Sequence, residues 1–400
     1  MNNSQQNKRV YLDWAAATPL SDRPFTAMEP FLRVHYGNPS SIHQEGGRAR
    51  QAVNTAREQI ASAVQVKPER VTFTGGGTEG NNLSIFGVIE STKQTGIKYS
   101  DMELITTKIE HPSVIGAVEK LRQLGVSVNY VNVTDLGLID LNHLQELLSD
   151  KTVLVSCAYA NSEIGTVQPI RAIRKIIRTK EEEAGTLIYF HVDAAQAPLW
   201  LSCQFDSTGA DFLVLDAAKC CGPKGVGVLI QSKRAKLLPV TFGGGQEQGI
   251  RPGTENVSGI VGAGIAIQDA QSTFRERADK VTRVRDEGIA YLKEKLPTAI
   301  LNGAAGEDRL ANNINISIPK LDTEYTAVVL DSKGFAVSTK SACAGAGGGE
   351  SKVVKEISQD SGRATATLRL SLGPETTIEE VREAVNIIAA HTERMQELTQ

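Results

Sequence analysis

The chain has 400 residues, 40% of them hydrophobic, and a formal net charge of −3 at pH 7. A chain of this length and composition can bury a large core and is expected to form more than one domain. Lysine and arginine form no block in the sequence, which argues against a nucleic-acid partner. The first ten residues, MNNSQQNKRV, contain no apolar export signal, and no apolar run is long enough to span a membrane, so we expect a cytoplasmic protein without a membrane partner.

Five cysteines are spaced neither as a CxxC pair nor as zinc ligands, and their number is odd. They are Cys157, Cys203, Cys220, Cys221 and Cys343. Free thiols in a reducing compartment are therefore expected, and no metal site is expected. Cys157 lies within the apolar run VLVSCAYA, which favours a small core residue over a nucleophile.

The first segments of the chain predict an arm and then a glycine turn. Residues 1–20, which include YLDWAAATPL, are expected to be extended, because proline and small residues disfavour a helix there. Farther on, VTFTGGGTEGNN predicts a strand, a turn and a helix. Gly75, Gly77 and Gly80 match the GxGxxG pattern of dinucleotide sites, but the next strand, ELITTK, does not end in the acidic residue that ribose recognition requires. A helix start after such a turn can bind other phosphates, or Thr78 can cap a tight turn.

Two later strands end beside polar residues. ELITTKIEHPSV places His111 between a strand and the proline that opens a helix. An imidazole there can stack on a planar ring, and a structural histidine is the alternative. The apolar strand in TVLVSCAYANSEIG ends at Asn161, for which an ordinary polar loop residue is the alternative.

The stretch 187–227 carries a carboxylate and a lysine at separate strand ends. LIYFHV is an apolar run that ends on Asp193, FLVL is a second one that ends on Asp216, and Lys219 lies in the turn before GVGVLI. Ligands bind at strand ends in open α/β sheets, so Asp193 and Lys219 can face one site. Pyridoxal 5'-phosphate (PLP) needs a lysine that forms a Schiff base and an aspartate that pairs with its pyridinium nitrogen. Two solvated loop charges are the alternative.

HVDAAQ followed by DAAKCCGPKG resembles the PLP-lysine region of the NifS/IscS-like cysteine desulfurases, in the class V aminotransferase group of fold-type I PLP enzymes. The resemblance runs over nearly the whole chain. It implies an α/β fold, with a mostly parallel seven-stranded sheet between helices in a large domain and a smaller α+β C-terminal domain. We expect an N-terminal arm at 1–20 that packs with the small domain, a large PLP-binding domain at 21–264, and a small domain at 265–400 that carries the catalytic cysteine loop.

The resemblance also implies residues that bind PLP. Lys219 would bind the cofactor covalently, and Asp193 would pair with the ring nitrogen. His111, in the matching EH motif, would stack on the ring and take part in proton transfer. Gly77 and Thr78 would hold the phosphate.

Further residues would complete the cofactor site and link two subunits. Asn161 and Gln196 would hydrogen-bond the phenolic oxygen of PLP, and Asn161 would also contact the substrate. Thr254, in GGGQEQGIRPGTEN, would reach the phosphate in the other subunit, which implies a homodimer.

The C-terminal part would supply the substrate site and the nucleophile. Arg369 in TLRLSLG matches the arginine that grips the substrate carboxylate, and Cys343 in SAC matches the nucleophile. The implied reaction converts L-cysteine to L-alanine, leaves a persulfide on Cys343 and passes sulfur to an acceptor protein. The alternatives are a selenocysteine lyase or another class V PLP lyase and, in a different class, a PLP-free interaction protein that keeps the fold. No family-type extension follows HTERMQELTQ, so the acceptor and its pathway, iron–sulfur assembly included, stay open.

One segment departs from the family pattern. The family usually has SGHK, whose serine and histidine donate to the PLP phosphate, whereas this chain has DAAK, with Asp216 and Ala218 at those positions. We therefore expect PLP to bind more weakly than is usual for the family. In the alternative, Asp216 is protonated or turns away to pair with a nearby arginine or lysine.

Overall fold

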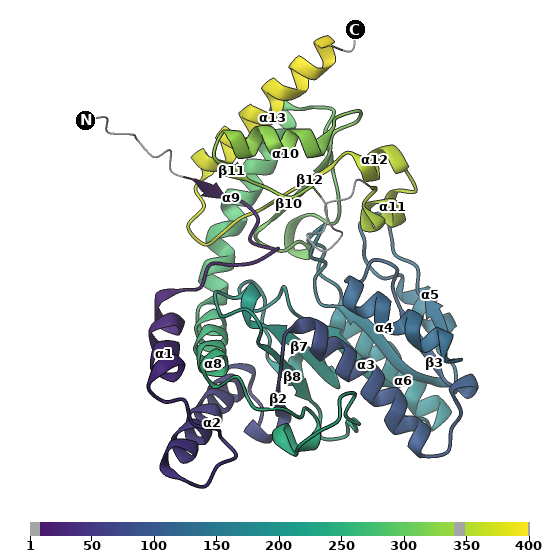
Figure 1. The fold of residues 1–400 in the computed structure, drawn as a ribbon. Helices are drawn as coiled ribbons and strands as arrows, with labels where there is room; N and C mark the ends of the chain where they lie inside the picture. The colour runs from purple at the N-terminus through teal and green to yellow at the C-terminus, as the bar shows by residue number, and fades with distance from the viewer. Residues whose placement is uncertain (1–8, 340–348, 399–400) are drawn as a thin grey trace.

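A seven-stranded sheet forms the centre of the computed structural model, which describes residues 9–339 and 349–398 (Figure 1). The strands occur in the order β2-β8-β7-β6-β5-β3-β4. Their bounds are β2 (Val71–Thr74), β3 (Glu103–Thr106), β4 (Ser127–Tyr130), β5 (Thr152–Ala158), β6 (Tyr189–Asp193), β7 (Phe212–Asp216) and β8 (Gly227–Gln231). Strand β8 is antiparallel to β2 and β7, and the other neighbouring pairs are parallel. The carboxyl ends of β3, β5, β6 and β7 therefore lie along one edge of the sheet, together with that of β2.

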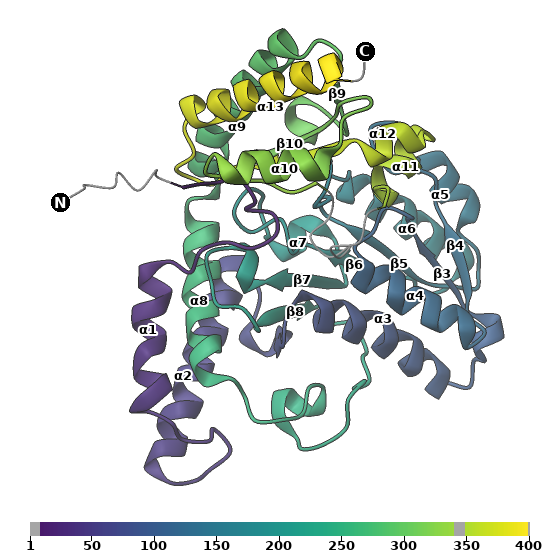
Figure 2. The ribbon, with the colours of Figure 1, turned by 45° about the horizontal axis from the view of Figure 1, so that its top comes forward.

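Helices cover both faces of this sheet (Figures 1 and 2). On one face lie α3 (Gly77–Gln94) and α4 (Pro112–Gln123), whose apolar side chains share a core with the strands. On the other face lie α2 (Gln44–Val64), α6 (Ile170–Ala184) and α8 (Val257–Ser272). Helix α1 (Asp22–Arg33) packs on α8, and the short helices α5 (Leu141–Leu147) and α7 (Phe205–Thr208) pack on α6. Short 3-10 helices are η1 (Pro68–Arg70), η2 (Tyr99–Asp101), η3 (Ala217–Lys219), η4 (Gln246–Gly249) and η5 (Gly306–Asp308).

The alternation of side chains along β6 decides where its polar residues point. Phe190 and Val192 belong to the core shared with α2, α6 and α8, whereas Tyr189 belongs to the core shared with α3 and α4. Successive side chains of a strand point to opposite faces, so His191 and Asp193 point to the same face as Tyr189. Two polar side chains of this central strand thus face α3.

A smaller second lobe lies above the sheet in Figure 1. It contains an antiparallel three-stranded sheet in the order β12-β10-β9, with β9 (Ile300–Leu301), β10 (Asn313–Ser317) and β12 (Thr367–Ser371). Helix α13 (Ile378–Leu398) packs against both α9 (Phe274–Lys295) and α10 (Thr323–Ser332). The short helices α11 (Lys352–Ser358) and α12 (Ser361–Thr365) complete this lobe. Because α9 follows α8 after Thr273 alone, the two lobes are joined by nearly continuous helix.

The N-terminal segment runs between the two lobes. Strand β1 (Val10–Tyr11) pairs in parallel with β11 (Phe335–Ala336) of the second lobe. Farther along the segment, the Thr18 N–H donates to the carbonyl of Ala218, beside the end of β7, at 3.0 Å. The residues between these two points therefore pass the edge of the central sheet where the parallel strands end.

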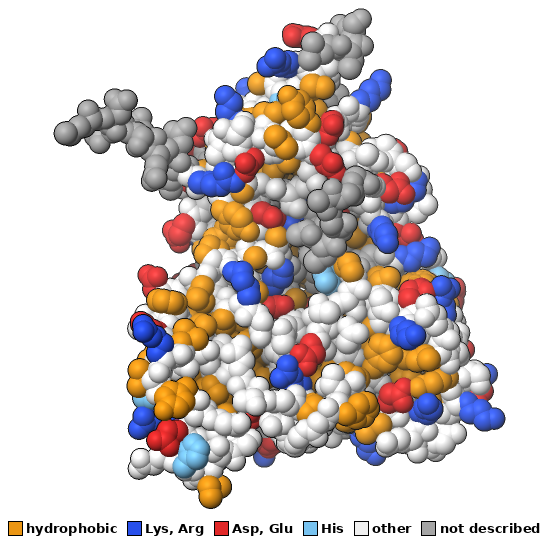
Figure 3. Space-filling model, in the orientation of Figure 1, with side chains coloured by type: hydrophobic (Ala, Val, Ile, Leu, Met, Phe, Trp, Pro, Cys, Tyr) orange, Lys and Arg blue, Asp and Glu red, His pale blue; other side chains and the backbone are white. Residues whose placement is uncertain are grey.

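This architecture confirms the predicted α/β fold, with a mostly parallel seven-stranded sheet between helices and a smaller α+β region. The predicted boundary at 264/265 falls inside α8 and stays a prediction. Every helix among the described residues is too short or too polar to cross a membrane. Basic and acidic side chains are interspersed over the face in Figure 3, so that face carries no broad field of one sign.

Candidate active site

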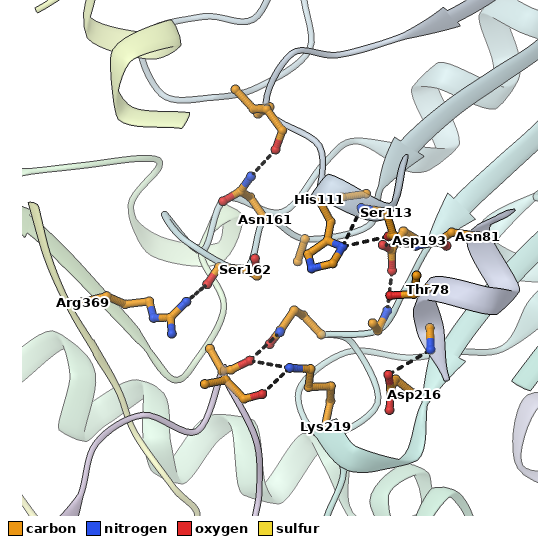
Figure 4. A pocket seen from close by; sticks show the side chains of 18 residues that line it. Thr78, Asn81, His111, Ser113, Asn161, Ser162, Asp193, Asp216, Lys219 and Arg369 are labelled. Atoms are coloured by element: carbon orange, nitrogen blue, oxygen red, sulfur yellow. Dashed lines mark hydrogen bonds between the residues drawn. The ribbon is translucent and has the colours of Figure 1, made fainter. Parts of the chain in front are cut away.

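A cavity of about 260 Å³ opens at the edge where the parallel strands end (Figure 4). Its walls come from residues near the ends of β5, β6 and β7, the start of α3, the N-terminal segment and β12. Eight of the predicted site residues line it, namely Gly77, Thr78, His111, Asn161, Asp193, Gln196, Lys219 and Arg369. The fold thus brings together residues that are far apart in the sequence.

Lys219 is the last residue of η3, directly after β7, and its side chain extends to the N-terminal segment. Its Nζ donates to the carbonyl oxygen of Ala15 at 3.1 Å and also to that of Ala16. Backbone carbonyls accept hydrogen bonds whatever their side chain, so two alanines can hold the ammonium group. The lysine is thus held at the cavity wall, at the same sheet edge as Asp193.

Asp193 ends β6 and is only 8% exposed. Its Oδ2 accepts a hydrogen bond from Asn81 Nδ2 at 2.7 Å, and its Oδ1 accepts one from the Ala195 N–H at 3.0 Å. The two bonds fix the plane of the carboxylate from opposite oxygens. A fixed carboxylate in the cavity can pair with a cationic ring nitrogen.

Asn81, on the first turns of α3, connects Asp193 to other buried polar groups. Its Nδ2 also donates to Ser113 Oγ at 2.9 Å, and its Oδ1 lies 3.1 Å from His191 Nε2. His191 is fully buried, and burial lowers its pKa to about 3, so the ring is neutral at physiological pH. The amide oxygen can only accept, so Nε2 carries the ring proton and Nδ1 accepts from the Ser156 hydroxyl at 2.8 Å.

His111 caps the N-terminus of α4 and its ring points into the cavity (Figure 4). Its Nδ1 accepts the backbone N–H of Ser113 at 3.2 Å and lies 2.7 Å from the Ser113 hydroxyl. Because a backbone N–H can only donate, Nδ1 is the unprotonated nitrogen and Nε2 carries the proton of the neutral ring. Burial lowers the pKa of His111 below its ordinary value, although the Asp193 charge opposes the shift. A neutral imidazole held this way can accept and return a proton.

Asn161 and Gln196 lie on the cavity wall with their amides already oriented by the backbone. Asn161 Nδ2 donates to the Ile109 carbonyl at 2.8 Å, and Gln196 Nε2 donates to the Ala15 carbonyl at 2.9 Å. Each amide nitrogen has two hydrogens, so one donor of each remains after these bonds. Both residues can therefore donate to an oxygen in the cavity and keep their hydrogen bonds to the Ile109 and Ala15 carbonyls.

Arg369 reaches the cavity from β12 of the second lobe and is 1% exposed. Its Nη1 donates to the Ser162 carbonyl at 2.9 Å, and its Nη2 donates to the Asp13 carboxylate at 2.7 Å. Its buried Nε has no partner among the described residues. A guanidinium held on two sides, with donors left over, is suited to bind a small carboxylate.

The start of α3 faces the cavity, and a carboxylate lies against it. Gly76, which precedes the helix, has a φ of +147°, a conformation that side-chain-bearing residues rarely adopt. The N–H of Gly77 donates to Asp216 Oδ2 at 2.9 Å, and the N–H of Ala218 donates to Asp216 Oδ1 at 2.9 Å. Asp216 therefore points at the helix start, and not toward an arginine or lysine of the described residues (Figure 4).

Glu110, the residue before His111, is a second buried carboxyl group close to Asp193. Burial raises its pKa to about 8, and the Asp193 charge adds to the shift, whereas a hydrogen bond from Thr107 Oγ1 at 2.7 Å opposes it. Glu110 is thus largely protonated at neutral pH. A second anion beside Asp193 would be repelled by its charge, and the protonated Glu110 avoids this repulsion.

One predicted residue lies away from the cavity, and another falls outside the residues that the structure describes. Thr254 is exposed in the loop before α8 and does not line the cavity of its own chain. Cys343 lies outside the described residues. Burial raises the pKa of the Cys157 and Cys220 thiols well above the ordinary value, and Cys157 is fully buried, in keeping with the core position predicted for it.

Several contributors to the site were not predicted from the sequence, among them Asn81, Ser113 and the carbonyls of Ala15 and Ala16. Asn81 lies three residues after Thr78, so helical spacing puts both on one face of α3, and that signal was available. Ser113 follows His111 in a capping position. The alanine carbonyls leave no signal, because every residue has one.

The residues of the cavity fit PLP at its aldehyde and ring ends. Lys219 supplies an amine, Asp193 a buried fixed carboxylate and His111 a ring nearby, while the unpartnered Nε of Arg369 suits a substrate carboxylate. For the phosphate, the start of α3 would offer N–H donors, but Asp216 takes that of Gly77. No three or more His, Cys, Asp or Glu side chains of residues 9–339 and 349–398 are grouped to hold a metal ion.

Comparisons with known proteins identify the family. A family model described as Aminotransferase class-V matches residues 10–383. A protein named Cysteine desulfurase IscS from Dictyoglomus turgidum is 37% identical over 392 residues, which cover 98% of this chain and 96% of that protein. A protein named Putative cysteine desulfurase IscS 1 from Bacillus subtilis is 37% identical over 397 residues, which cover 97% of this chain and 100% of that protein.

Solved structures agree with this relationship. A structure described as a NifS-like protein superposes with a TM-score of 0.88 at 32% identity, covering 96% of this chain and 99% of that chain. A structure described as SspA in complex with cysteine superposes with a TM-score of 0.76 at 30% identity, covering 91% and 99%. The resemblance inferred from HVDAAQ and DAAKCCGPKG is confirmed, and the chain belongs to the aminotransferase class-V family, alongside NifS-like proteins and proteins named cysteine desulfurase IscS.

Proposed function

We propose that this chain is a PLP-dependent cysteine desulfurase that converts L-cysteine to L-alanine. The observation that carries the proposal is the meeting of Lys219, Asp193 and His111 in one cavity at the sheet edge. A lysine, an acidic partner for the ring nitrogen and an imidazole beside the ring are groups that PLP chemistry uses. Relatives named cysteine desulfurase at 37% identity support this reaction in particular.

PLP, when bound, supplies an aldehyde that captures primary amines and a ring that withdraws electrons from them. Lys219 would hold the cofactor through its Nζ, which donates to the Ala15 and Ala16 carbonyls in the structure. Asp193 favours the protonated form of the ring nitrogen, because an adjacent anion stabilises the cation. His111, whose neutral ring lines the cavity, would accept or return a proton there.

Arg369 binds the carboxylate of L-cysteine, and Cys343 receives the sulfur. The Cys343 thiolate attacks the substrate sulfur, the carbon–sulfur bond breaks, a sulfur–sulfur bond forms, and the substrate carbon takes up a proton. One thiol and one cysteine thus give one persulfide and one L-alanine, so the step needs no external oxidant or reductant. The match of the SAC motif supports the role of Cys343, and an acceptor protein then takes the sulfur from its persulfide.

We also infer a homodimer in which Thr254 reaches the phosphate of the cofactor in the partner subunit. Apolar side chains are unusually exposed on α1 and in the segment that leads to α2, where Figure 3 shows apolar atoms at the surface. These side chains are Phe25, Leu32, Val34, Tyr36 and Ile42, with exposed fractions from 50% to 99%. An exposed apolar surface of this kind is typical of a subunit interface.

The state of the cysteines supports a cytoplasmic location. Cys157, Cys203, Cys220 and Cys221 are free thiols. Free thiols are usual in proteins of a reducing compartment. We therefore infer that the protein works in the cytoplasm.

The proposal is tested by following L-alanine formation from L-cysteine by the protein supplied with PLP. The native protein should release L-alanine, and Lys219→Ala should abolish turnover while the fold is kept. Lys224→Ala is the matched control, because Lys224 is an exposed lysine in the same turn and lies outside the cavity. No L-alanine from the native protein, or equal turnover in Lys219→Ala and Lys224→Ala, contradicts the proposal.

A further inference from the structure

The chain places an anion of its own against the helix start in the candidate active site. Along β7, Phe212 and Val214 belong to the core shared with α3, and by the alternation of a strand Asp216 points to the same face. Its Oδ2 accepts the N–H of Gly77, the first residue of α3, at 2.9 Å, and its Oδ1 accepts the N–H of Ala218 at 2.9 Å. The first N–H groups of a helix have no partner within the helix, so they bind anions.

Little room is left at this helix start for a second anion to use the same donor. A Cβ added to Gly77 would lie 3.2 Å from Asp216 Oδ2, so the carboxylate touches the helix backbone. The other carboxylate of this turn, Glu79, is paired with Arg251 at 2.8 Å. No arginine or lysine within the described ranges forms an ion pair with Asp216, so its charge is not offset in this way. The contrast with Glu79 indicates that the negative charge of Asp216 acts directly on the helix start.

We propose that Asp216 is an internal competitor for the cofactor phosphate and determines how strongly the protein selects PLP over unphosphorylated pyridoxal. In the structure the carboxylate accepts the Gly77 N–H. A phosphate must displace the carboxylate or bind beside it, and two anions at one helix start repel each other. Pyridoxal has the same aldehyde and ring for Lys219 and Asp193 but no phosphate, so it escapes this competition. The inference rests on the proposed function, because it takes PLP as the cofactor.

Two substitutions separate the charge of Asp216 from its size. Asp216→Asn keeps the shape and an acceptor oxygen but removes the charge, and Asp216→Ser introduces a small hydroxyl that can donate to a phosphate. Both should lower the dissociation constant of PLP at least about tenfold, since a repulsion is removed and a charge-assisted bond becomes possible. The dissociation constant of pyridoxal should change by less than about threefold. The cofactor-free variants should melt a few degrees lower, because the cap of α3 is weakened.

The experiment titrates the cofactor-free native protein and both variants with PLP and, separately, with pyridoxal, and follows the visible absorbance of the bound ligand. Each ligand is compared with itself across the variants. The melting temperature of each cofactor-free protein is measured in parallel. Asp140→Asn is the matched control, because Asp140 caps α5 by accepting the N–H groups of Asn142 and His143 at 3.0 and 3.1 Å, away from the cavity. It should lower the melting temperature and leave both affinities unchanged.

Each of the two Asp216 variants removes the charge, so either one alone can test the inference if the other fails to fold. A PLP affinity that stays the same or falls in the folded variants, while the native protein binds PLP, would overturn this inference and leave the proposed function intact. Equal gains for PLP and pyridoxal would also overturn it, since the gain would not depend on the phosphate. If neither the native protein nor the variants bind PLP, the proposed function fails and this inference fails with it.

Discussion

Asn81 Nδ2 donates to the Asp193 carboxylate at 2.7 Å, and this bond ties the start of α3 to the end of β6 inside the candidate active site. A second hydrogen bond fixes the orientation of the Asn81 amide, because its oxygen accepts the N–H of His191 Nε2, whose ring is buried and neutral. The same amide nitrogen supports Ser113, which contacts His111. One side chain thus positions both the carboxylate and the imidazole of the site.

Asn81→Ala should lower the free energy of unfolding by about 1–3 kcal/mol, because it leaves His191 Nε2 and Asp193 Oδ2 buried without this partner. It should also weaken PLP binding, since Asp193 loses one of the two bonds that fix its plane. Urea unfolding and PLP titration measure the two effects. Asn82→Ala is the control, because Asn82 is the partly exposed neighbour whose amide donates to two backbone carbonyls, of Thr78 at 2.9 Å and of Ser113 at 3.3 Å, and not to Asp193. Equal stability and PLP affinity of the two variants would contradict the positioning role of Asn81.

Glu110 should make stability depend on pH. Its pKa is raised by burial from an ordinary value of 4.5 to about 8, so the native state binds its proton more tightly than the unfolded state does. Between these two values the unfolded state gains from ionisation, and the native protein loses up to about 1.4 kcal/mol of stability per pH unit as the pH rises. Glu110→Gln has no proton to lose there. The unfolding free energy of Glu110→Gln minus that of the unsubstituted protein should therefore increase from pH 6 to pH 8. A difference that stays constant over this range would show that Glu110 is not buried as a neutral acid.

Arg369→Lys should raise KM for L-cysteine at least about tenfold with a smaller effect on kcat, because an ammonium group cannot present the guanidinium fork to a carboxylate. Steady-state L-alanine formation measures both constants. Arg363→Lys is the matched control, since Arg363 donates to Asn302 in the second lobe and does not line the cavity. The assignment of Arg369 to the substrate carboxylate fails if the two variants share the same KM.

Cys343→Ser should still bind PLP and L-cysteine but lose L-alanine formation at least about a hundredfold, because a hydroxyl does not accept the substrate sulfur. Cys157→Ala should keep turnover, since burial raises the pKa of that thiol and disfavours its thiolate. Mass spectrometry after a short exposure to L-cysteine should find the persulfide on Cys343. A persulfide on Cys157, or full turnover in Cys343→Ser, would reject the assignment.

The ends of two central strands were predictable because they depend on local pattern, whereas the fold was expected from the family resemblance. The apolar runs LIYFHV and FLVL predicted strands that end on Asp193 and Asp216, and the structure ends β6 and β7 at those residues. Once the strands are parallel neighbours, their ends meet at one edge by geometry alone. The lysine in the following turn must then lie near the same edge.

Other parts of the site depend on contacts that no local pattern specifies. The bond from Asn81 to Asp193 joins residues 112 positions apart, and its existence depends on how α3 is rotated over the sheet. The direction of Asp216 was left open between the phosphate site and a basic partner, because both were compatible with DAAK. In the structure Asp216 accepts the N–H of Gly77, and this packing, which no local pattern specifies, sets its direction. The carbonyls that hold Lys219 come from Ala15 and Ala16, whose side chains have no chemistry to signal the contact.

The residue that carries PLP can be identified directly by reducing the PLP-loaded protein with borohydride, digesting it and locating the phosphopyridoxyl group by mass spectrometry. The group should be found on Lys219 in the native protein and in Lys224→Ala, and it should be absent from Lys219→Ala. Modification of Lys224 in the native protein, or a reducible link to PLP that persists in Lys219→Ala, would contradict the assignment of this cavity as a PLP site built on Lys219.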